Sequence, residues 1–200
     1  MTRTDRTRLQ KQLDFIVECE KLKTILRQTR SLCENRAEND AEHSWHLALM
    51  TMLLAEYAAP GTDFFRVMQM VLIHDIVEID AGDAYCYDAS LRNARKQAEE
   101  AAAQRLFDLL PDDQAQLFHA LFDEFNAQTT PEARFAAALD RFQPLLWDCL
   151  ADGTSLAEHR VSFDVLLQCN KAIAQGAPAL WDYLRPLLEA YRRKAATSGQ

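Results

Sequence analysis

The chain has 200 residues, of which 48% are hydrophobic and 26% are charged, and this composition is typical of a folded globular protein rather than a disordered one. Its formal charge of -8 argues against a general nucleic-acid-binding or membrane-surface protein, because those surfaces are themselves negatively charged. A small anionic substrate remains compatible, since a metal ion and one or two arginines can reverse the field locally.

The cysteine pattern and the apolar runs indicate the cellular setting. The five cysteines are scattered and form no C-x-x-C pair, so the sequence predicts neither a disulfide framework nor a thiolate zinc site. The first fifteen residues lack the apolar segment of a secretory signal, and no apolar run approaches the roughly 20 residues that span a bilayer. We therefore expect a soluble cytoplasmic protein with one domain over residues 1–200.

Few glycines and prolines, together with long Ala/Leu/Glu/Gln/Arg stretches, predict an all-α bundle of about eight helices without strand-like alternation. In chain order, helices are expected from Arg6 to about Leu26, Asn39 to Ala58, Asp63 to Ile79, Leu91 to Leu110, Pro111 to Phe125, Thr130 onward, Ser155 to Ala174, and Pro178 to Lys194. A polar connection, Gln28 to Asn39, should separate the first two. Asn39 with Glu42 resembles a capping box, Asp63 can cap the third helix, and Thr130-Pro131 is a helix start signal.

The adjacent pair His74-Asp75 lies within the apolar run from Val67 to Val77. Burying an imidazole and a carboxylate side by side is costly unless something pairs them, and a divalent metal ion satisfies both. Glu78 follows one helical turn later.

Two further polar residues fall on apolar helix faces. His43 lies in the first turn of the second expected helix, and Asp140 follows two small alanines in the helix after Pro131. Taken singly, His43 is better explained as a hydrogen-bonded core histidine, and Asp140 as a capping or ion-paired carboxylate. Together with His74-Asp75, they bring polar groups from three helices into an apolar interior, and this combination favours a metal site.

Four sequence elements occur in order: Arg36-x-Glu38-Asn39-x-Ala41-Glu42-His43-Ser44, His74-Asp75-x-x-Glu78, Gly82-Asp83 and Asp140-Arg141. In this order and spacing they resemble the HD-domain phosphohydrolase superfamily, and in particular its small one-domain branch that contains the 5′-deoxynucleotidases. The resemblance covers about residues 10–150, with an HD core at about 38–150.

The resemblance implies an HD-type helical bundle in which His43, His74, Asp75 and Asp140 bind one divalent metal ion. It implies that Glu78 assists proton transfer. It also implies a nucleotide as substrate and a homodimer.

Two substrate contacts also follow from the resemblance. Asp83 should touch the sugar of a nucleoside monophosphate, and an arginine before the first metal ligand should hold the phosphate. Arg27 is the best match for this arginine, and Arg30 is the competitor. Gln28 stands where the deoxynucleotidases carry a tryptophan that crowds the ribose 2′ position, so the sequence leaves the choice between ribose and deoxyribose open.

The donor set is informative about the chemistry by itself. Two imidazoles and two carboxylates suit Mn²⁺, Co²⁺, Fe²⁺, Ni²⁺, Zn²⁺ or Mg²⁺ and do not choose among them. Four protein ligands would leave room for a phosphate oxygen and for a water whose pKa falls from about 15.7 towards roughly 7. Glu78 could take the proton of this water or protonate the leaving oxygen, and Arg27 would neutralise phosphate charge.

We therefore expect a metal-dependent phosphomonoesterase that converts nucleoside 5′-monophosphates, with deoxynucleotides as the first choice, into nucleoside and phosphate. One alternative keeps the metal and acts on a nucleoside triphosphate, a cyclic dinucleotide or an alarmone. The chain length disfavours it, because such family members carry extra domains or a second histidine pair. Another alternative is a binding module without turnover, which the intact set of site residues disfavours.

Overall fold

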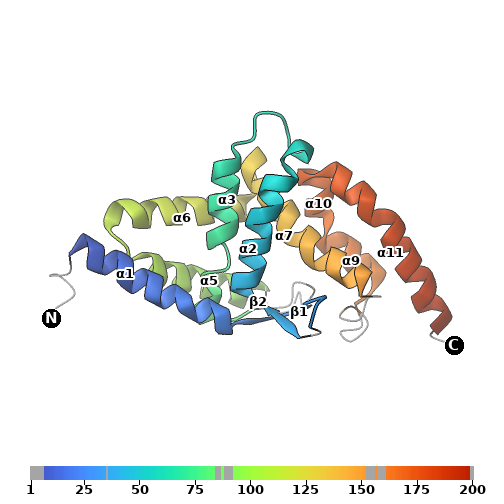
Figure 1. Cartoon of the computed structure of the whole chain (residues 1–200), viewed down its shortest axis with the longest axis horizontal. Coiled ribbons are helices and arrows are strands. Elements are labelled where there is room, and N and C mark those ends of the chain that lie inside the picture. Colours follow the sequence, from blue (N-terminus) through green and yellow to red (C-terminus); the bar gives the residue numbers. More distant parts are fainter. Residues whose placement is uncertain are drawn as a thin grey trace.

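The computed structural model describes residues 7–34, 36–83, 87, 92–151, 156 and 161–198, and these are mostly helical (Figure 1). The helices are α1 (Arg8–Cys19), α2 (Asp40–Leu53), α3 (Phe64–Ile73), α4 (Glu78–Ala81), α5 (Arg92–Phe107), α6 (Asp112–Ala127), α7 (Pro131–Leu150), α9 (Phe163–Cys169), α10 (Lys171–Gly176) and α11 (Pro178–Ser198). The helical fold predicted from the sequence is confirmed. Within the described ranges, none of these helices combines the length and the apolarity that a membrane span requires.

The structure shows the expected starts of three helices, α2, α3 and α7. The Asn39 side chain accepts a hydrogen bond from the backbone N–H of Glu42, and the Glu42 side chain accepts one from the backbone N–H of Asn39, which completes a capping box. Asp63 caps α3, and Thr130 caps α7 with Pro131 at the first helical position. These local signals fix where α2, α3 and α7 begin. They therefore also fix the positions of the polar residues along these helices.

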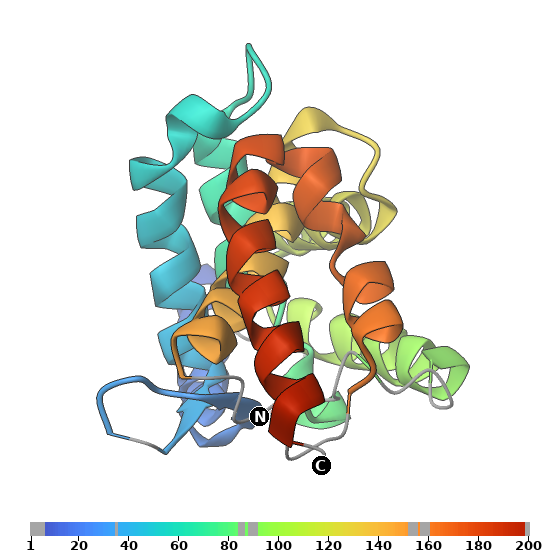
Figure 2. The same ribbon diagram turned by 90° about the vertical axis from the view of Figure 1, so that its right-hand side faces the viewer.

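Helix α7 is the element around which the others pack, because it contacts α2, α3, α6, α10 and α11. Its buried alanines at 133, 136, 137 and 138 let neighbouring backbones come close. The tightest approach is at Gly176 of α10, where an added Cβ would lie 2.0 Å from the carbonyl oxygen of Arg134. In Figure 2, α2 lies on one side of the molecule and α9 on the opposite side, with α11 in front of the core.

The prediction of one long first helix followed by a polar connection is wrong. Helix α1 ends at Cys19, a 3₁₀ turn covers Glu20–Thr24, and strand β1 (Leu26–Arg30) pairs antiparallel with β2 (Ala37–Asn39). The inward side chains of this hairpin, including Thr29 and Glu38, are polar. Because apolar and polar residues do not alternate, the sequence carries no ordinary strand signal.

The expected third helix is also shorter than predicted. Helix α3 ends at Ile73, and His74 is its C-cap. The chain then makes a tight turn in which the N–H of Glu78 donates to the carbonyl oxygen of Asp75 at 2.9 Å. A 3₁₀ turn, Ala55–Tyr57, likewise follows α2, so the second expected helix stops at Leu53.

The C-terminal half differs in one respect. The single helix expected from Ser155 to Ala174 is described as the two helices α9 and α10, which meet at Asn170. The expected start at Ser155 lies outside the described residues.

Candidate active site

The structure brings together the four residues expected to bind a metal. His43 lies in the first turn of α2, His74 and Asp75 lie where α3 ends, and Asp140 lies midway along α7. Nε2 of His43 is 3.1 Å from Oδ1 of Asp140 and 3.9 Å from Oδ2 of Asp75. Nε2 of His74 is 3.1 Å from Oδ1 of Asp75 and 3.6 Å from Oδ1 of Asp140.

A buried chain of hydrogen bonds sets the tautomer of His43. The amide nitrogen of Gln143 donates to Glu38 at 2.8 and 3.1 Å, so the amide oxygen of Gln143 faces His43. That oxygen can only accept a hydrogen bond, and Nδ1 of His43 lies 3.1 Å from it. Nδ1 therefore carries the proton, and the lone pair of Nε2 points at Asp140.

His74 is oriented in the same way by the backbone. Its Nδ1 lies 3.0 Å from the carbonyl oxygen of Val71, which can only accept, so Nδ1 of His74 also carries a proton. Nε2 of His74 is buried and has no hydrogen-bond partner among the described residues. Both imidazoles thus direct Nε2 at the carboxylates of Asp75 and Asp140.

This arrangement fits a divalent cation. An imidazole lone pair that faces a carboxylate oxygen at 3.1 Å is repelled unless a proton or a cation lies between them. Burial, and then the charge of Arg27, lower the pKa of His43, which disfavours a proton there. The ligand atoms of His43, His74 and Asp75 lie within 4.8 Å of one another, which one ion can bridge.

The charges of the cluster act on one another. Burial works to raise the pKa of Asp140, but Arg141, His43 and His74 outweigh it and hold that pKa well below its usual range. Burial also works to raise the pKa of Asp75, but the charges of His74 and Arg27 outweigh burial and lower that pKa. The pKa of His74 is raised because the charges of Asp75 and Asp140 outweigh burial. Both carboxylates are therefore ionised, as a ligand to a cation must be.

Arg27 on β1 reaches into the same cluster. Its Nη1 donates to Oδ2 of Asp75 at 2.7 Å and lies 3.4 Å from Oδ1 of Asp40, and its Nη2 lies 4.0 Å from Oδ1 of Asp140. The Arg27 side chain is only 12% exposed, so the guanidinium lies inside the cavity rather than on the surface. Between the two candidate arginines, this placement favours Arg27 over Arg30.

Glu78 opens α4 and is nearly completely buried. Burial, followed by the charges of Asp75 and Asp40, raises the pKa of Glu78 to about 11. One carboxyl oxygen accepts a hydrogen bond from Arg95 at 3.2 Å, and the other has no partner in the described part of the chain. Glu78 can therefore hold a proton beside the predicted ligands.

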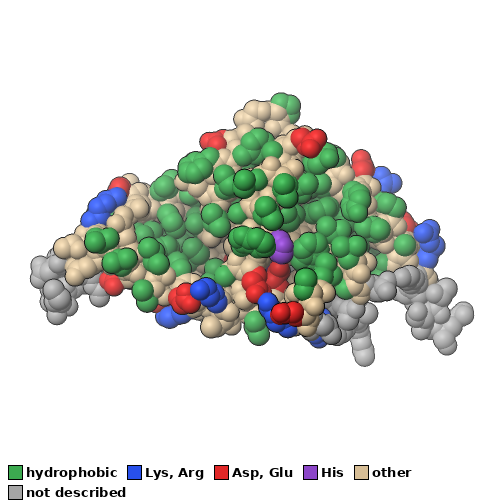
Figure 3. All heavy atoms as spheres, viewed as in Figure 1, with side chains coloured by type: hydrophobic (Ala, Val, Ile, Leu, Met, Phe, Trp, Pro, Cys, Tyr) green, Lys and Arg blue, Asp and Glu red, His purple; other side chains and the backbone are tan. Residues whose placement is uncertain are grey.

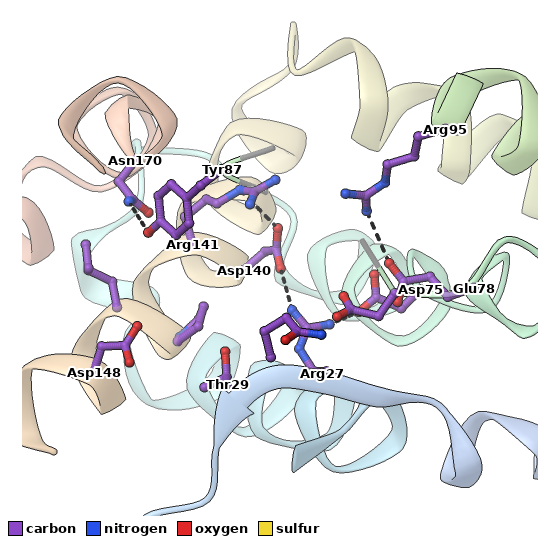
Figure 4. A pocket seen from close by; sticks show the side chains of 14 residues that line it. Arg27, Thr29, Asp75, Glu78, Tyr87, Arg95, Asp140, Arg141, Asp148 and Asn170 are labelled. Atoms are coloured by element: carbon purple, nitrogen blue, oxygen red, sulfur yellow. Dashed lines mark hydrogen bonds and ion pairs between the residues drawn. The ribbon is translucent and has the colours of Figure 1, made fainter. Parts of the chain in front are cut away.

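One cavity joins these groups, as Figure 4 shows. Arg27 from β1, Arg95 from α5 and Arg141 from α7 point into it together with Asp75, Asp140 and Glu78. Thr29, Asp148, Tyr87 and Asn170 line its other end, where Asn170 donates to the Tyr87 hydroxyl at 2.9 Å. Asp83, the expected sugar contact, and Gln28 also line this cavity. Three guanidinium groups beside a cation site make the cavity suitable for an anion.

Sequence reasoning missed several of these residues. Glu38 belongs to the motif that was recognised, but nothing in the sequence shows that Gln143, a hundred residues after His43, completes the chain of hydrogen bonds. Asp40, fully buried beside Arg27, looks in the sequence like an ordinary first-turn acid. Arg95 precedes a charged run that resembles a solvated helix face, and only the fold brings it to Glu78.

A helical fold with paired histidines and aspartates on three helices defines a recognised class of protein. A family model described as an HD domain matches residues 19–181. The chain belongs to the HD domain family.

Named relatives match part of the chain. The 5′-deoxynucleotidase HDDC2 of Homo sapiens is 27% identical over 111 residues, which is 56% of this chain and 53% of that protein. The 5′-deoxynucleotidase YfbR of Shigella flexneri serotype 5b (strain 8401) is 29% identical over 123 residues, 57% of this chain and 61% of that protein. The chain thus spans little more than half the length of these curated relatives.

A solved structure matches over nearly the whole length. The crystal structure of a predicted metal-dependent phosphohydrolase from Magnetospirillum magnetotacticum MS-1 is 46% identical, covers 98% of each chain and superimposes with a TM-score of 0.90. The fold is therefore supported across α1 to α11.

Proposed function

We propose that this protein is a metal-dependent phosphomonoesterase that hydrolyses nucleoside 5′-monophosphates, deoxynucleotides among them, to a nucleoside and phosphate. The observation that carries the proposal is the convergence of His43, His74, Asp75 and Asp140. Asp75 and Asp140 line the same cavity as the Arg27 guanidinium. The names of the relatives support the reaction class, since the two cited are 5′-deoxynucleotidases and the matched crystal structure is described as a phosphohydrolase.

In this proposal, His43, His74, Asp75 and Asp140 hold one divalent ion of the series Mn²⁺, Co²⁺, Fe²⁺, Ni²⁺, Zn²⁺ or Mg²⁺. When bound, the ion supplies Lewis-acid chemistry: it polarises a phosphate oxygen and acidifies a water molecule. The histidine nitrogens suited to this role are the two Nε2 atoms, because both Nδ1 atoms are occupied by acceptors.

The remaining residues of the cavity bind the substrate and move the proton. Arg27 neutralises the non-bridging phosphate oxygens. Glu78, buried beside the predicted metal ligands, gives a proton to the leaving 5′ oxygen while Arg95 fixes the orientation of its carboxyl group. Asp83, on the same cavity wall, accepts a hydrogen bond from the sugar hydroxyl.

The test is phosphate release from purified protein across a panel of nucleotides. We expect monophosphates to yield free phosphate, EDTA to abolish the release, and one or more of the six ions to restore it. Asp75→Ala should lower turnover by more than about 1,000-fold, since a metal site contributes several kcal/mol to the barrier. It should also lose bound metal and keep its helical circular dichroism. Asp112→Ala, an exposed carboxylate at the start of α6, is the matched control and should match wild type.

The panel also separates the competing substrates. Release of triphosphate or diphosphate would show that the substrate is another nucleotide. If the metal-loaded protein releases no phosphate from any nucleotide, the protein is a binding module without turnover. Because Gln28 lines the cavity where a tryptophan would crowd the ribose, each base should be tested as both ribo- and deoxyribonucleotide. Equal rates for the two sugars would contradict a preference for deoxyribose.

We further propose that the chain acts as one HD-type domain in a cytoplasmic homodimer, with a free nucleotide rather than a nucleic acid or membrane as its partner. The net charge of -8 supports the exclusion of those two partners, because the charge repels them. The homodimer rests on the family resemblance, and the location rests on the scattered cysteines, which form no C-x-x-C pair. Subunit mass in solution tests the first, and fractionation of cells tests the second.

A further inference from the structure

Helix α2 carries an apolar stripe on the side away from the active site. Trp45, Leu49, Met52 and Leu53 follow the spacing i, i+4, i+7 and i+8, so they lie on one side of the helix. Their exposed fractions are between 37% and 68%, although a stripe of this spacing is normally the buried side of a helix. Nothing within the described chain covers this stripe.

Helix α1 repeats the pattern. Leu9, Leu13, Ile16 and Val17 have the same spacing and are 49% to 71% exposed, while Phe15 on the other side of the helix is buried. The apolar pattern that predicted the first helix is therefore largely directed outward. On α3, Phe65 and Leu72 are 66% and 48% exposed. We call these ten side chains of α1, α2 and α3 the apolar face.

The apolar face lies on the side of the molecule drawn in Figure 3, where hydrophobic side chains gather over α1, α2 and α3. Lys, Arg, Asp and Glu lie mainly along its edges in this view. Along α2, the sequence contains no Asp, Glu, Lys or Arg between Glu42 and Glu56. A surface this poor in charge is unusual on a chain with a net charge of -8.

The size of the apolar face distinguishes a docking surface from ordinary scattered exposure. Ten large side chains, each roughly half exposed, present on the order of 1,000 Å² of apolar surface. The largest apolar patch of a typical monomer is roughly 300–600 Å². A stable dimer covers about 800 Å² on each partner, which this face can supply by itself.

We infer that the apolar face is the surface through which two copies of this chain dimerise. A second copy fits because two uncharged surfaces meet without the repulsion that two acidic chains would otherwise experience, and because an identical patch is self-complementary about a two-fold axis. A membrane fits less well, because an interfacial helix normally flanks its apolar stripe with Lys and Arg, and this chain is acidic. The inference extends the proposed homodimer by naming its surface, and it is independent of the proposed catalytic activity.

Sedimentation velocity of the full chain tests the inference, with Met52→Glu on α2, Ile16→Glu on α1 and Val165→Glu as control. Helix α9 lies on the opposite side of the molecule from α2 (Figure 2). Its residue Val165 is as exposed as Leu49, at 38% against 37%. Wild type and the control should sediment at twice the 22.8 kDa chain mass. Met52→Glu and Ile16→Glu should each raise the dimer dissociation constant by at least about 100-fold, because a two-fold axis places each glutamate in the interface twice. Their circular dichroism should equal that of wild type, since both side chains are exposed.

Other results would overturn the inference. A wild-type chain that remains monomeric up to about 100 µM has no such interface. A dimer that keeps its mass in both Met52→Glu and Ile16→Glu forms through another surface. Monomeric protein that binds vesicles, with binding lost in Met52→Glu, would assign the apolar face to a membrane. No substrate is present in these measurements, so they are independent of the catalytic activity. A chain that dimerises but is inactive contradicts only the proposed function. An active chain whose dimer is unaffected by Met52→Glu and Ile16→Glu contradicts only this inference.

Discussion

The two sides of helix α2 differ in a way that inverts the usual rule of protein surfaces. The inward side carries His43, fully buried, and the Asp40 carboxylate lies fully buried beside Arg27. The outward side carries Trp45, Leu49 and Met52, which are exposed. Ordinary helices place charge outside and apolar side chains inside, because burying an ion is costly and exposing an apolar stripe is unfavourable.

The comparison teaches where the chain departs from what folding alone would select. If the interior served stability alone, apolar residues would be favoured in place of His43 and Asp75. Replacing buried ions by well-packed hydrophobic residues is often neutral or stabilising. Likewise, if the surface of α2 stayed in contact with water, as in a monomer, a polar residue would be favoured in place of Met52. Each departure therefore supports one of the two proposals: a reaction site on the inward side and a dimer contact on the outward side. The predictions below separate these two roles, beginning with the largest effect.

Replacing Arg27 should produce the largest change on the inward side. Arg27→Ala removes the cation that lies 2.7 Å from Asp75, and we expect kcat/KM for a nucleoside monophosphate to fall by about 1,000-fold, as for other arginines that stabilise a reacting phosphate. Arg27→Lys keeps the charge but loses the planar fork, and it should recover only part of the activity. Arg30→Ala is the matched control on the same strand and should remain close to wild type.

A larger loss in Arg30→Ala than in Arg27→Ala would transfer the phosphate contact to Arg30. Arg27→Ala also leaves Asp75 and Asp40 as buried carboxylates without their guanidinium partner, so its thermal unfolding must be recorded. If Arg27→Ala unfolds, Arg27→Lys carries the comparison, because it retains a positive charge at the same position.

Two leucines on α2 measure the difference between its sides directly. Leu47 is fully buried and Leu49 belongs to the apolar face. Leu47→Ala should lower the free energy of unfolding by about 2–5 kcal/mol, because it removes packed methyl groups and leaves a cavity. Leu49→Ala should lower it by less than about 1 kcal/mol in dilute, monomeric protein, since its side chain is already partly in water. Urea unfolding of both variants below the dimer dissociation constant gives the two values. Equal losses would mean that Leu49 is packed against the chain itself.

Local signals predicted much of this fold. The capping box at Asn39 and Glu42 and the Thr130-Pro131 start are encoded within a few residues, so they could be read without tertiary information. The hairpin of β1 and β2 could not be predicted in this way, because Thr29 and Glu38 occupy inward positions that would be apolar in an ordinary strand. The turn after Ile73 was missed for a similar reason: the apolar run continues through it, and helical periodicity carries no signal at the place where the backbone changes.

The site was predictable as far as its motifs reach. His43, His74, Asp75 and Asp140 were expected together, and the structure places the printed pairs of their ligand atoms 3.1 to 3.9 Å apart. The groups that orient them were not expected. Gln143 and Arg95 act through single long-range contacts, and one glutamine or arginine on a helix resembles any other until the fold pairs it.

Gln143 gives the most subtle test of the inward side. It touches neither the cavity nor a substrate, but it holds the proton of His43 on Nδ1 and thereby frees Nε2. Gln143→Leu should weaken metal binding by about 10–100-fold, the usual effect of removing a group that orients a ligand. Saturating metal should then restore most of kcat with KM for the nucleotide unchanged. Gln114→Leu is the matched control, because it removes a 2.7 Å amide hydrogen bond to Gln12 far from the site. If Gln143→Leu binds metal like wild type, the orientation of His43 comes from packing alone. If added metal fails to restore turnover, Gln143 acts on the reaction itself rather than through His43.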